Sequence, residues 1–365
     1  MSVAAPRARL LARVLLALPL CTALAGCPAG HGDPNQGDGA LLDLGRDGNT
    51  PQPSDGGRDR ACAPLDPRMV PAEVSVQPED GEAPFVDVLK GATRSIRVFC
   101  YLMGKGSVLD TLKAKAAAGV DVRVILDQGY SANQDMYLEL QRAGITVLWS
   151  DPQFPYMHAK AMVVDDSDAV VSTGNYSAYY IARERNYVVR LRDPDDVADI
   201  ARIFDDDYRR AAPDLRCTRL LVSPVNSKDR LLGLINGARK SVLIESMQFA
   251  ETDVRVAVAA RRSFGIDVRV LLADPGWITA NNDAAAYLAR AGVPVRYLRS
   301  LDVHVKSVLV DPDDDARAYA GSENLSYTSL TKNRELGVFL TEPAAVRKMR
   351  ETFEADWAKA TPFPQ

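Results

Sequence analysis

The sequence of 365 residues predicts an α/β protein made of two pseudo-symmetric halves. One observation is an internal duplication, in which "GATRSIRVFCYL" at 91–102 resembles "GARKSVLIESMQ" at 237–248, and "GVDVRVILD" at 119–127 resembles "GIDVRVLLA" at 265–273. Both pairs are offset by 146 residues. A second observation is that strand-like and helix-like stretches alternate in each half, which is typical of βαβ units. We therefore expect two α/β sandwich halves, each with a largely parallel sheet and helices on both faces.

Each half presents its elements in the same order. A strand precedes a helical stretch such as "GSVLDTLKAKAAAG", and the strand "DVRVILD" follows it. A second helical stretch, "NQDMYLELQRAG" or "NNDAAAYLARAG", leads to a short strand and then to a strand that begins near a histidine. Ligands on such sheets usually bind at the carboxyl ends of the strands. Neither half carries a Gly-x-Gly-x-x-Gly or a phosphate-binding loop, so a nucleotide cofactor is not indicated.

The amino terminus is predicted to lie outside the fold. Residues 1–27 combine three arginines with the apolar run "LLARVLLALPL", as in an export signal, and end in "LAGC". This ending resembles the lipobox of bacterial lipoproteins, which implies that Cys27 becomes a lipidated first residue and holds the exported protein to a membrane of the bacterial cell envelope. A simple cleavable signal and an uncleaved anchor are the alternatives.

Residues 28–62 are rich in Gly, Pro and Asp and predict a flexible linker, which leaves residues 63–213 and 214–365 as the two repeats. Of the five cysteines, Cys62 and Cys217 lie in polar sequence and are predicted to form a disulfide, which an exported protein can hold. Cys100 lies in an apolar run. The net charge of −4 provides no general attraction to nucleic acid.

Two of the three histidines occupy matching settings, in "MHAKAMVVD" at 157–165 and "VHVKSVLVD" at 303–311. Both stretches follow the pattern His-x-Lys-x4-Asp, formed by His158, Lys160 and Asp165 in the first half and by His304, Lys306 and Asp311 in the second. Because residues i and i+2 of a strand share a face, each histidine and its lysine should point the same way. Each aspartate should point the other way, and we expect a structural role for it, holding the turn that follows.

Paired motifs of this kind in duplicated α/β halves resemble the phospholipase D superfamily, which includes phospholipases, cardiolipin and phosphatidylserine synthases, and some nucleases. In the family pattern a Gly-Ser-x-Asn follows each motif. Here "GSEN" supplies Ser322 and Asn324, and "STGN" supplies Thr173 and Asn175. The resemblance runs from about residue 70 to 360 and implies a monomer with one active site assembled at the interface of the two halves.

The residue types suit phosphodiester cleavage. An uncharged imidazole can attack phosphorus and split the reaction into two steps, while a protonated imidazole gives the leaving alcohol its proton. By resemblance to bacterial members, His158 is the expected nucleophile and His304 the expected general acid. Charges and amide donors that stabilise the phosphoryl oxygens are expected from Lys160, Lys306, Asn175 and Asn324.

The group that orients each imidazole is left open by the sequence. Glu335 lies eleven residues after Asn324, where the family often has a glutamate that orients a histidine. The first half has Asn186 at this spacing and Glu184 two residues earlier. No metal or other cofactor is expected, because a lysine beside each histidine repels cations and the acidic run that starts at Asp311 lacks the pattern of a calcium loop.

The predicted function is that of a membrane-tethered phospholipase D that cleaves phospholipid head groups through a phosphohistidine, with transfer to an alcohol as a second outcome. A metal-independent endonuclease of the same superfamily is the first alternative, and it would need a basic groove and bind less tightly as salt rises. A catalytically inactive envelope binding protein is the second alternative. The two intact motifs argue against it.

Overall fold

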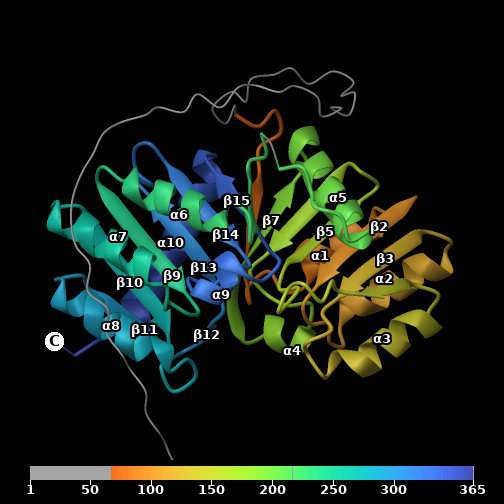
Figure 1. The fold of residues 1–365 in the computed structure, drawn as a ribbon, viewed down its shortest axis with the longest axis horizontal. Helices are drawn as coiled ribbons and strands as arrows, with labels where there is room; N and C mark the ends of the chain where they lie inside the picture. The colour runs from red at the N-terminus through yellow and green to blue at the C-terminus, as the bar shows by residue number, and fades with distance from the viewer. Residues whose placement is uncertain (1–66, 216, 365) are drawn as a thin grey trace, which may run out of the picture. The chain divides into compact units, whose positions relative to one another are not determined.

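The computed structural model describes residues 67–215 and 217–364. The predicted signal at 1–27, the linker at 28–62, Cys27 and Cys62 all lie outside these residues. The described chain forms two eight-stranded mixed sheets, one from each half, as Figure 1 shows. The predicted boundary at 213/214 falls between the last helix of the first half and the first strand of the second, and it stays a prediction.

The first sheet has the strand order β1-β7-β6-β5-β2-β3-β4, with β12 of the second half beside β7. The first-half strands are β1 (Glu73–Gln77), β2 (Ser95–Cys100), β3 (Asp121–Leu126), β4 (Thr146–Trp149), β5 (Lys160–Val164), β6 (Asp168–Ser172) and β7 (Glu184–Leu191). The helices are α1 (Ala83–Lys90), α2 (Ser107–Ala117), α3 (Asn133–Arg142), α4 (Ala178–Ile181) and α5 (Pro194–Tyr208).

The second sheet has the order β16-β11-β10-β9-β13-β14-β15-β8. The second-half strands are β8 (Leu220–Ser223), β9 (Ser241–Ser246), β10 (Asp267–Ala273), β11 (Val295–Leu298), β12 (Asp302–Val303), β13 (Lys306–Val310), β14 (Arg317–Gly321), β15 (Glu335–Leu340) and β16 (Thr361–Pro362). The helices are α6 (Ser227–Asn236), α7 (Thr252–Ser263), α8 (Ala280–Arg290), α9 (Tyr327–Thr331) and α10 (Pro343–Lys359). The two pseudo-symmetric α/β halves are thus confirmed.

The expectation of largely parallel sheets is wrong for part of each half. Strands β2, β3 and β4 run parallel, but β5 pairs with β2 antiparallel, and β6 and β7 continue antiparallel. A short turn joins β5 to β6, and a short connection permits only antiparallel pairing, whereas parallel neighbours need a crossover of a dozen or more residues. The second half repeats this change of direction at β13 and β14.

Because side chains alternate between the two faces of β5, its residues pack into two different apolar clusters. Ala161 and Val163 belong to a cluster that combines apolar residues of both halves, whereas Met162 and Val164 pack with the α1, α2 and α3 side of the first half. Helices α5 and α10 contribute to the shared cluster. The two sheets are therefore joined by one apolar core, which fixes the first half against the second. Within the described residues, every helix is too short or too polar to cross a bilayer.

The aspartates of the two motifs anchor the chain at the end of the strand remote from the histidines. The carboxylate of Asp165 accepts hydrogen bonds from the backbone N–H groups of residues 93, 94 and 95 at 2.7–2.8 Å. Asp311 does the same for residues 239, 240 and 241 at 2.7–2.9 Å. The expectation of a structural role fits these bonds, but the turn held is the one that leads into β2 or β9. The turn that follows Asp311 is closed by its backbone, whose carbonyl oxygen accepts a hydrogen bond from the N–H of Asp314 at 3.0 Å.

Candidate active site

The two motif lysines lie opposite the carboxyl ends of parallel strands. Lys160 pairs with Cys100, the last residue of β2, and Lys306 pairs with Ser246, the last residue of β9. Each histidine lies two residues before its lysine, just beyond this edge of the sheet. This is the edge at which the alternation of strands and helices predicts ligand binding.

The backbone of each histidine is bonded to the other half. The N–H of His158 donates to the carbonyl oxygen of Arg334 at 2.8 Å, and the N–H of His304 donates to that of Arg185 at 3.1 Å. Arg334 and Arg185 are equivalent residues, and each carries a buried guanidinium bound to a carboxylate, that of Asp207 at 2.9 Å and that of Asp356 at 2.6 Å respectively. The two histidines are thus brought into one site at the interface of the halves.

Glu335 of the second half binds the imidazole of His158 in the first. Its Oε2 lies 2.8 Å from Nδ1 of His158, and its Oε1 accepts hydrogen bonds from the Ser329 hydroxyl and, at 3.1 Å, from the Asn333 amide. Burial raises the pKa of Glu335, but His158 and Lys160 more than offset this, and the net shift is downward. Glu335 is therefore a carboxylate that accepts a hydrogen bond from Nδ1–H and leaves Nε2 of His158 as the ring nitrogen without a proton.

His304 is held by neutral groups of the first half, with Nζ of its own motif lysine, Lys306, also 2.9 Å from Nδ1. Its Nδ1 lies 3.0 Å from the carbonyl oxygen of Thr173 and 3.2 Å from Oδ1 of Asn186. Glu184 is farther, at 3.7 Å, and accepts a hydrogen bond from the Asn186 amide at 3.2 Å. Asn186 thus occupies at His304 the place that Glu335 occupies at His158, so the two imidazoles have different electrostatic surroundings.

Ser322 and Thr173 are equivalent residues that support these partners. The Ser322 hydroxyl accepts a hydrogen bond from the backbone N–H of Leu336 at 3.0 Å, and the Thr173 hydroxyl accepts one from that of Tyr187 at 3.0 Å. The Thr173 hydroxyl also donates to Oδ1 of Asn186 at 3.0 Å. Ser322 follows β14 and is bonded to β15, which carries Glu335. Thr173 follows β6 and is bonded to β7, which carries Asn186. Ser322 is therefore a structural support for the site.

Both lysines are fully buried. Nζ of Lys160 donates to the carbonyl oxygen of His158 at 2.5 Å, and Nζ of Lys306 donates to that of His304 at 2.5 Å. Burial lowers the pKa of Lys160 to about 8 and that of Lys306 well below its usual range, where the charge of Lys160 adds to the effect. The site therefore concentrates cationic groups that an anion would stabilise.

The same burial lowers the pKa of His158 to about 4, and Lys160 contributes although Glu335 opposes the shift. The pKa of His304 also falls well below its ordinary value, through burial and then through the charges of Lys306 and Lys160. At neutral pH both imidazoles are uncharged, the state in which a histidine is a nucleophile.

Asn175 and Asn324 follow the end of β6 and β14 and precede the short helices α4 and α9. In both residues the side-chain Oδ1 is buried and has no hydrogen-bond partner among the described residues. A buried amide group without a partner costs free energy, so its presence at the same place in both halves favours a role in binding a ligand. The backbone N–H of Asn324 donates to the Ser329 hydroxyl at 3.0 Å, which connects this residue to Glu335.

Several groups at the site were not predicted from the sequence. The Tyr101 ring lies 4.5 Å from that of His158 between centroids, and the Trp277 ring lies 6.4 Å from that of His304 with planes 24° apart. Asp127 accepts a hydrogen bond at 2.7 Å from the N–H of Met157 and so holds the segment that carries His158. Tyr101 and Asp127 follow β2 and β3 directly, and this position at the carboxyl edge is the signal that could have identified them.

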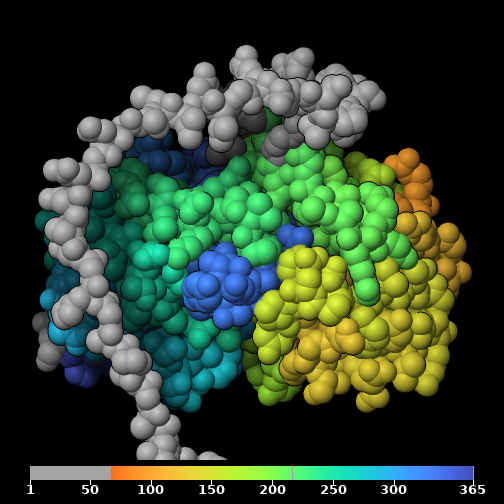
Figure 2. Space-filling model, in the orientation of Figure 1, coloured from red at the N-terminus to blue at the C-terminus, as the bar shows by residue number. Residues whose placement is uncertain are grey.

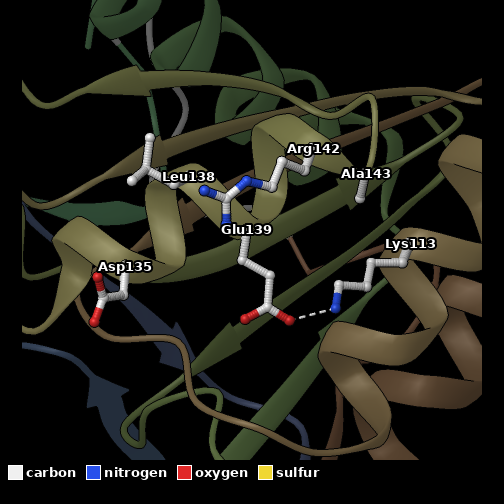
Figure 3. Close-up of a pocket in the computed structure, with 6 residues that line it drawn as sticks. All are labelled: Lys113, Asp135, Leu138, Glu139, Arg142 and Ala143. Atoms are coloured by element: carbon white, nitrogen blue, oxygen red, sulfur yellow. Dashed lines mark hydrogen bonds and ion pairs between the residues drawn. The ribbon is translucent and has the colours of Figure 1, made fainter.

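Other features lie apart from the site. A surface pocket between α2 and α3 is drawn in Figure 3, with an ion pair between Lys113 and Glu139, and none of its lining residues belongs to a motif.

Cys217 is in a disulfide and Cys100 is a buried free thiol. Because Cys62 lies outside the described residues, its pairing with Cys217 stays a prediction. Residues 67–215 and 217–364 contain no cluster of three or more His, Cys, Asp or Glu that could hold a metal.

Comparison with known proteins agrees with this geometry. The family described as "Cardiolipin synthase, PLD-like domain" matches residues 85–208 and 231–357. The chain is 24% identical over 334 residues to the probable cardiolipin synthase YwiE of Bacillus subtilis (strain 168), covering 76% of this chain and 65% of that protein. It is 27% identical over 296 residues to cardiolipin synthase B of Salmonella typhimurium (strain LT2), covering 68% and 70%.

Two solved structures share the fold. The phosphatidylserine synthase of Haemophilus influenzae Rd KW20 superposes with a TM-score of 0.64 at 14% identity, over 80% of this chain and 87% of that one. The polyphosphate kinase from Porphyromonas gingivalis superposes with a TM-score of 0.66 at 17% identity, over 80% and 48%. With both repeats matched and both motifs in one site, the chain belongs to the phospholipase D superfamily, as a member with cardiolipin synthase-like PLD domains.

Proposed function

We propose that the protein transfers phosphatidyl groups by cleaving the head-group phosphodiester of a phospholipid and passing the phosphatidyl group to water or to another alcohol. The observation that carries this proposal is the pair of histidines in one site, each with Nδ1 engaged by a group of the opposite half. In this proposal Nε2 of each ring acts on one side of the same phosphorus atom.

His158 is the nucleophile in this proposal. Its neutral Nε2 attacks phosphorus while Nδ1 keeps its proton and donates a hydrogen bond to Glu335, whose carboxylate stabilises the positive charge that develops on the ring. A bond forms between Nε2 and phosphorus, and the bond from phosphorus to the head-group oxygen breaks. The head group leaves as an alcohol when it takes a proton from Nε2 of His304.

The second step reverses these roles. His304, now neutral, removes the proton of a water or alcohol, whose oxygen attacks phosphorus and displaces Nε2 of His158. The pKa of His304 is low in the free site because of burial and the charge of Lys306. A phosphodiester anion beside the two lysines would offset that charge and raise the pKa, so the proton that the first step needs is favoured when substrate is bound.

The acid and base work is supported by fixed charges and dipoles. Lys160 and Lys306 are buried beside the histidines and can stabilise the negative charge that grows on the phosphoryl oxygens. The side chains of Asn175 and Asn324 can supply amide donors to the same oxygens.

The choice of a phospholipid rests on the comparisons. The relatives are named as cardiolipin synthases, and one structural neighbour is a phosphatidylserine synthase. Transfer to an alcohol and hydrolysis differ only in the acceptor of the second step. Attachment to a membrane of the cell envelope through an acylated Cys27 would place the site next to such a substrate.

The test is product analysis with the full-length chain. Phosphatidylglycerol vesicles are incubated with the protein in EDTA, with and without ethanol, and lipids are identified by mass spectrometry. We expect phosphatidylethanol with ethanol, and cardiolipin or phosphatidic acid without it. Cleavage of DNA without any lipid product would favour an endonuclease, and the absence of both activities would favour a binding protein.

A further inference from the structure

Exposed aromatic side chains occur close to the motif residues, either along the chain or through ring contacts. Among the described residues, five aromatics are more than a third exposed: Tyr156 (41%), Tyr179 (61%), Phe264 (70%), Trp277 (43%) and Tyr327 (57%). Tyr156, Tyr179 and Tyr327 lie within four residues of a motif residue along the chain, and the Trp277 ring contacts that of His304. We refer to Tyr156, Tyr179, Trp277 and Tyr327 as the aromatic rim.

Contacts tie the aromatic rim to the site. The Tyr156 ring lies 6.0 Å from that of Tyr101, which in turn contacts His158, and the Trp277 ring lies over His304. Tyr179 lies in α4 and Tyr327 begins α9, the two short helices that follow the motif asparagines. Figure 2 shows α9 as the blue group that stands out at the centre of this face, between the two halves.

Two cations accompany the rim in a symmetric way. The guanidinium carbon of Arg183 lies 3.9 Å from the centroid of the Tyr179 ring, and Nζ of Lys332 lies 5.9 Å from that of Tyr327. Arg183 and Lys332 are equivalent residues, 149 positions apart like Asn175 and Asn324. Both are exposed, and neither forms an ion pair with another residue that the structure describes. Each of the short helices α4 and α9 therefore carries one exposed tyrosine, and an exposed cation that lies near its ring follows the helix.

Tyrosine and tryptophan have an apolar ring and a polar atom, and for this reason they collect at the boundary between lipid and water. Unpaired cations at that level are attracted to anionic head groups. Nucleic acid would instead require a dense array of cations, which a chain with a net charge of −4 and two rim cations does not offer.

We propose that the aromatic rim, with Arg183 and Lys332, is a docking surface that seats the active site on the head-group layer of an anionic phospholipid bilayer. The inference rests on the proposed function in its choice of a phospholipid partner. Two rim residues connect to the histidine rings and two lie in the helices that follow the motif asparagines, so docking places a head-group phosphate at the site without removing the whole lipid from the membrane.

Hydrogen–deuterium exchange of the full chain tests the contact without requiring turnover. Vesicles of phosphatidylglycerol and phosphatidylcholine should slow exchange in peptides that cover residues 176–184 and 325–333, and should leave the peptide around Phe264 unchanged. Phe264 is a matched reference because it is the most exposed of the five aromatics and carries its own cation, Arg261, at 5.0 Å. Unchanged exchange at α4 and α9, or protection by a single-stranded oligonucleotide alone, overturns the proposal. Protection of α4 and α9 without lipid turnover would retain the docking surface and reject the proposed activity.

Substitutions then test whether the rim tyrosines themselves contact the bilayer. In the double variant Tyr179→Ser, Tyr327→Ser, the ratio of turnover on vesicles to turnover on a dispersed short-chain phospholipid should fall about tenfold. Phe264→Ser should leave this ratio unchanged. An equal loss on both substrates would mean that the tyrosines stabilise the fold, and an unchanged ratio would mean that they do not meet the bilayer. Either result contradicts the proposal.

The cations have a separate test. Arg183→Gln with Lys332→Gln should weaken binding to anionic vesicles about tenfold or more and leave binding to phosphatidylcholine vesicles unchanged, because each surface cation contributes to anionic binding only. Equal binding of this variant and the wild type to anionic vesicles rejects the role of the two cations. If no lipid is turned over, the variant and the wild type are compared by the exchange protection that anionic vesicles give at α4 and α9.

Discussion

Glu335 in β15 of the second half accepts a hydrogen bond from Nδ1 of His158 in the first half at 2.8 Å, although 177 positions separate them in the chain. The corresponding partner of His304 is an amide, Asn186, at 3.2 Å. The two halves thus exchange the groups that orient their histidines, and only one of the two imidazoles is paired directly with a carboxylate. This difference provides a physical basis for assigning the nucleophile to His158.

Glu335→Gln should lower kcat/KM by roughly a hundredfold or more, because the developing positive charge on His158 loses its carboxylate. Glu335 opposes the lowering of the pKa of His158, which is about 4. Its removal should therefore move the acid limb of the pH profile of kcat/KM to lower pH. Glu323→Gln, which changes a buried glutamate that contacts Ser227 and Tyr319, is the control for a buried Glu-to-Gln change without loss of charge, because burial raises the pKa of Glu323 to about 8. If the acid limb of Glu335→Gln stays at the wild-type pH, Glu335 does not influence the titration of His158 and the prediction is wrong.

His158→Ala and His304→Ala should each abolish turnover of a phospholipid, and the double variant should be little worse than either, as expected for groups that act as a unit. His304→Ala should still form a phosphoryl-enzyme with a nitrophenyl phosphodiester, whose leaving group needs no proton, while His158→Ala should form none. Mass spectrometry of peptides quenched at alkaline pH locates the adduct. An adduct on His304 would reverse the roles, and half-active single variants would indicate two independent sites.

Asp165→Ala should destabilise the fold by about 1–3 kcal/mol, because three backbone N–H groups at the start of β2 lose their acceptor. Burial raises the pKa of Asp165, but its hydrogen bonds dominate and lower the pKa to about 2. A carboxylate with a lowered pKa stabilises the fold above its unfolded pKa of about 4, and this stabilisation is lost as pH falls toward 2. Urea unfolding between pH 7 and pH 2 should therefore show a difference between wild type and variant that shrinks in acid. Asp121→Ala, which breaks only a surface ion pair with Arg123, should have a small effect at every pH. A constant difference for Asp165→Ala would contradict the assignment.

Cys27→Ser should release the protein from the membrane fraction and leave its activity on dispersed short-chain lipid intact, because residue 27 lies outside the two repeats in sequence. Fractionation of cells followed by carbonate washing measures the release. Retention of the variant in washed membranes would indicate an uncleaved anchor in place of an acylated cysteine.

The sequence alone determined the features that repeat locally along the chain. The offset of 146 residues predicted two equal halves, and the histidine and lysine of each motif were predicted to share one side of the chain. These predictions depend on the period of a strand and on the spacing of neighbouring residues, which the local backbone sets. Asp165 and Asp311 were expected to be structural for the same reason.

Only the tertiary structure decided which group meets which histidine. Internal similarity does not say whether Glu335 serves the histidine of its own half or that of the other, because both are remote in sequence. The packing of the two sheets on one apolar core places β15 beside the His158 segment and β7 beside the His304 segment. This brings Glu335 to His158, and Thr173 and Asn186 to His304, across the interface. Contacts of this kind depend on how two surfaces fit in space, and no local periodicity of the chain encodes that fit.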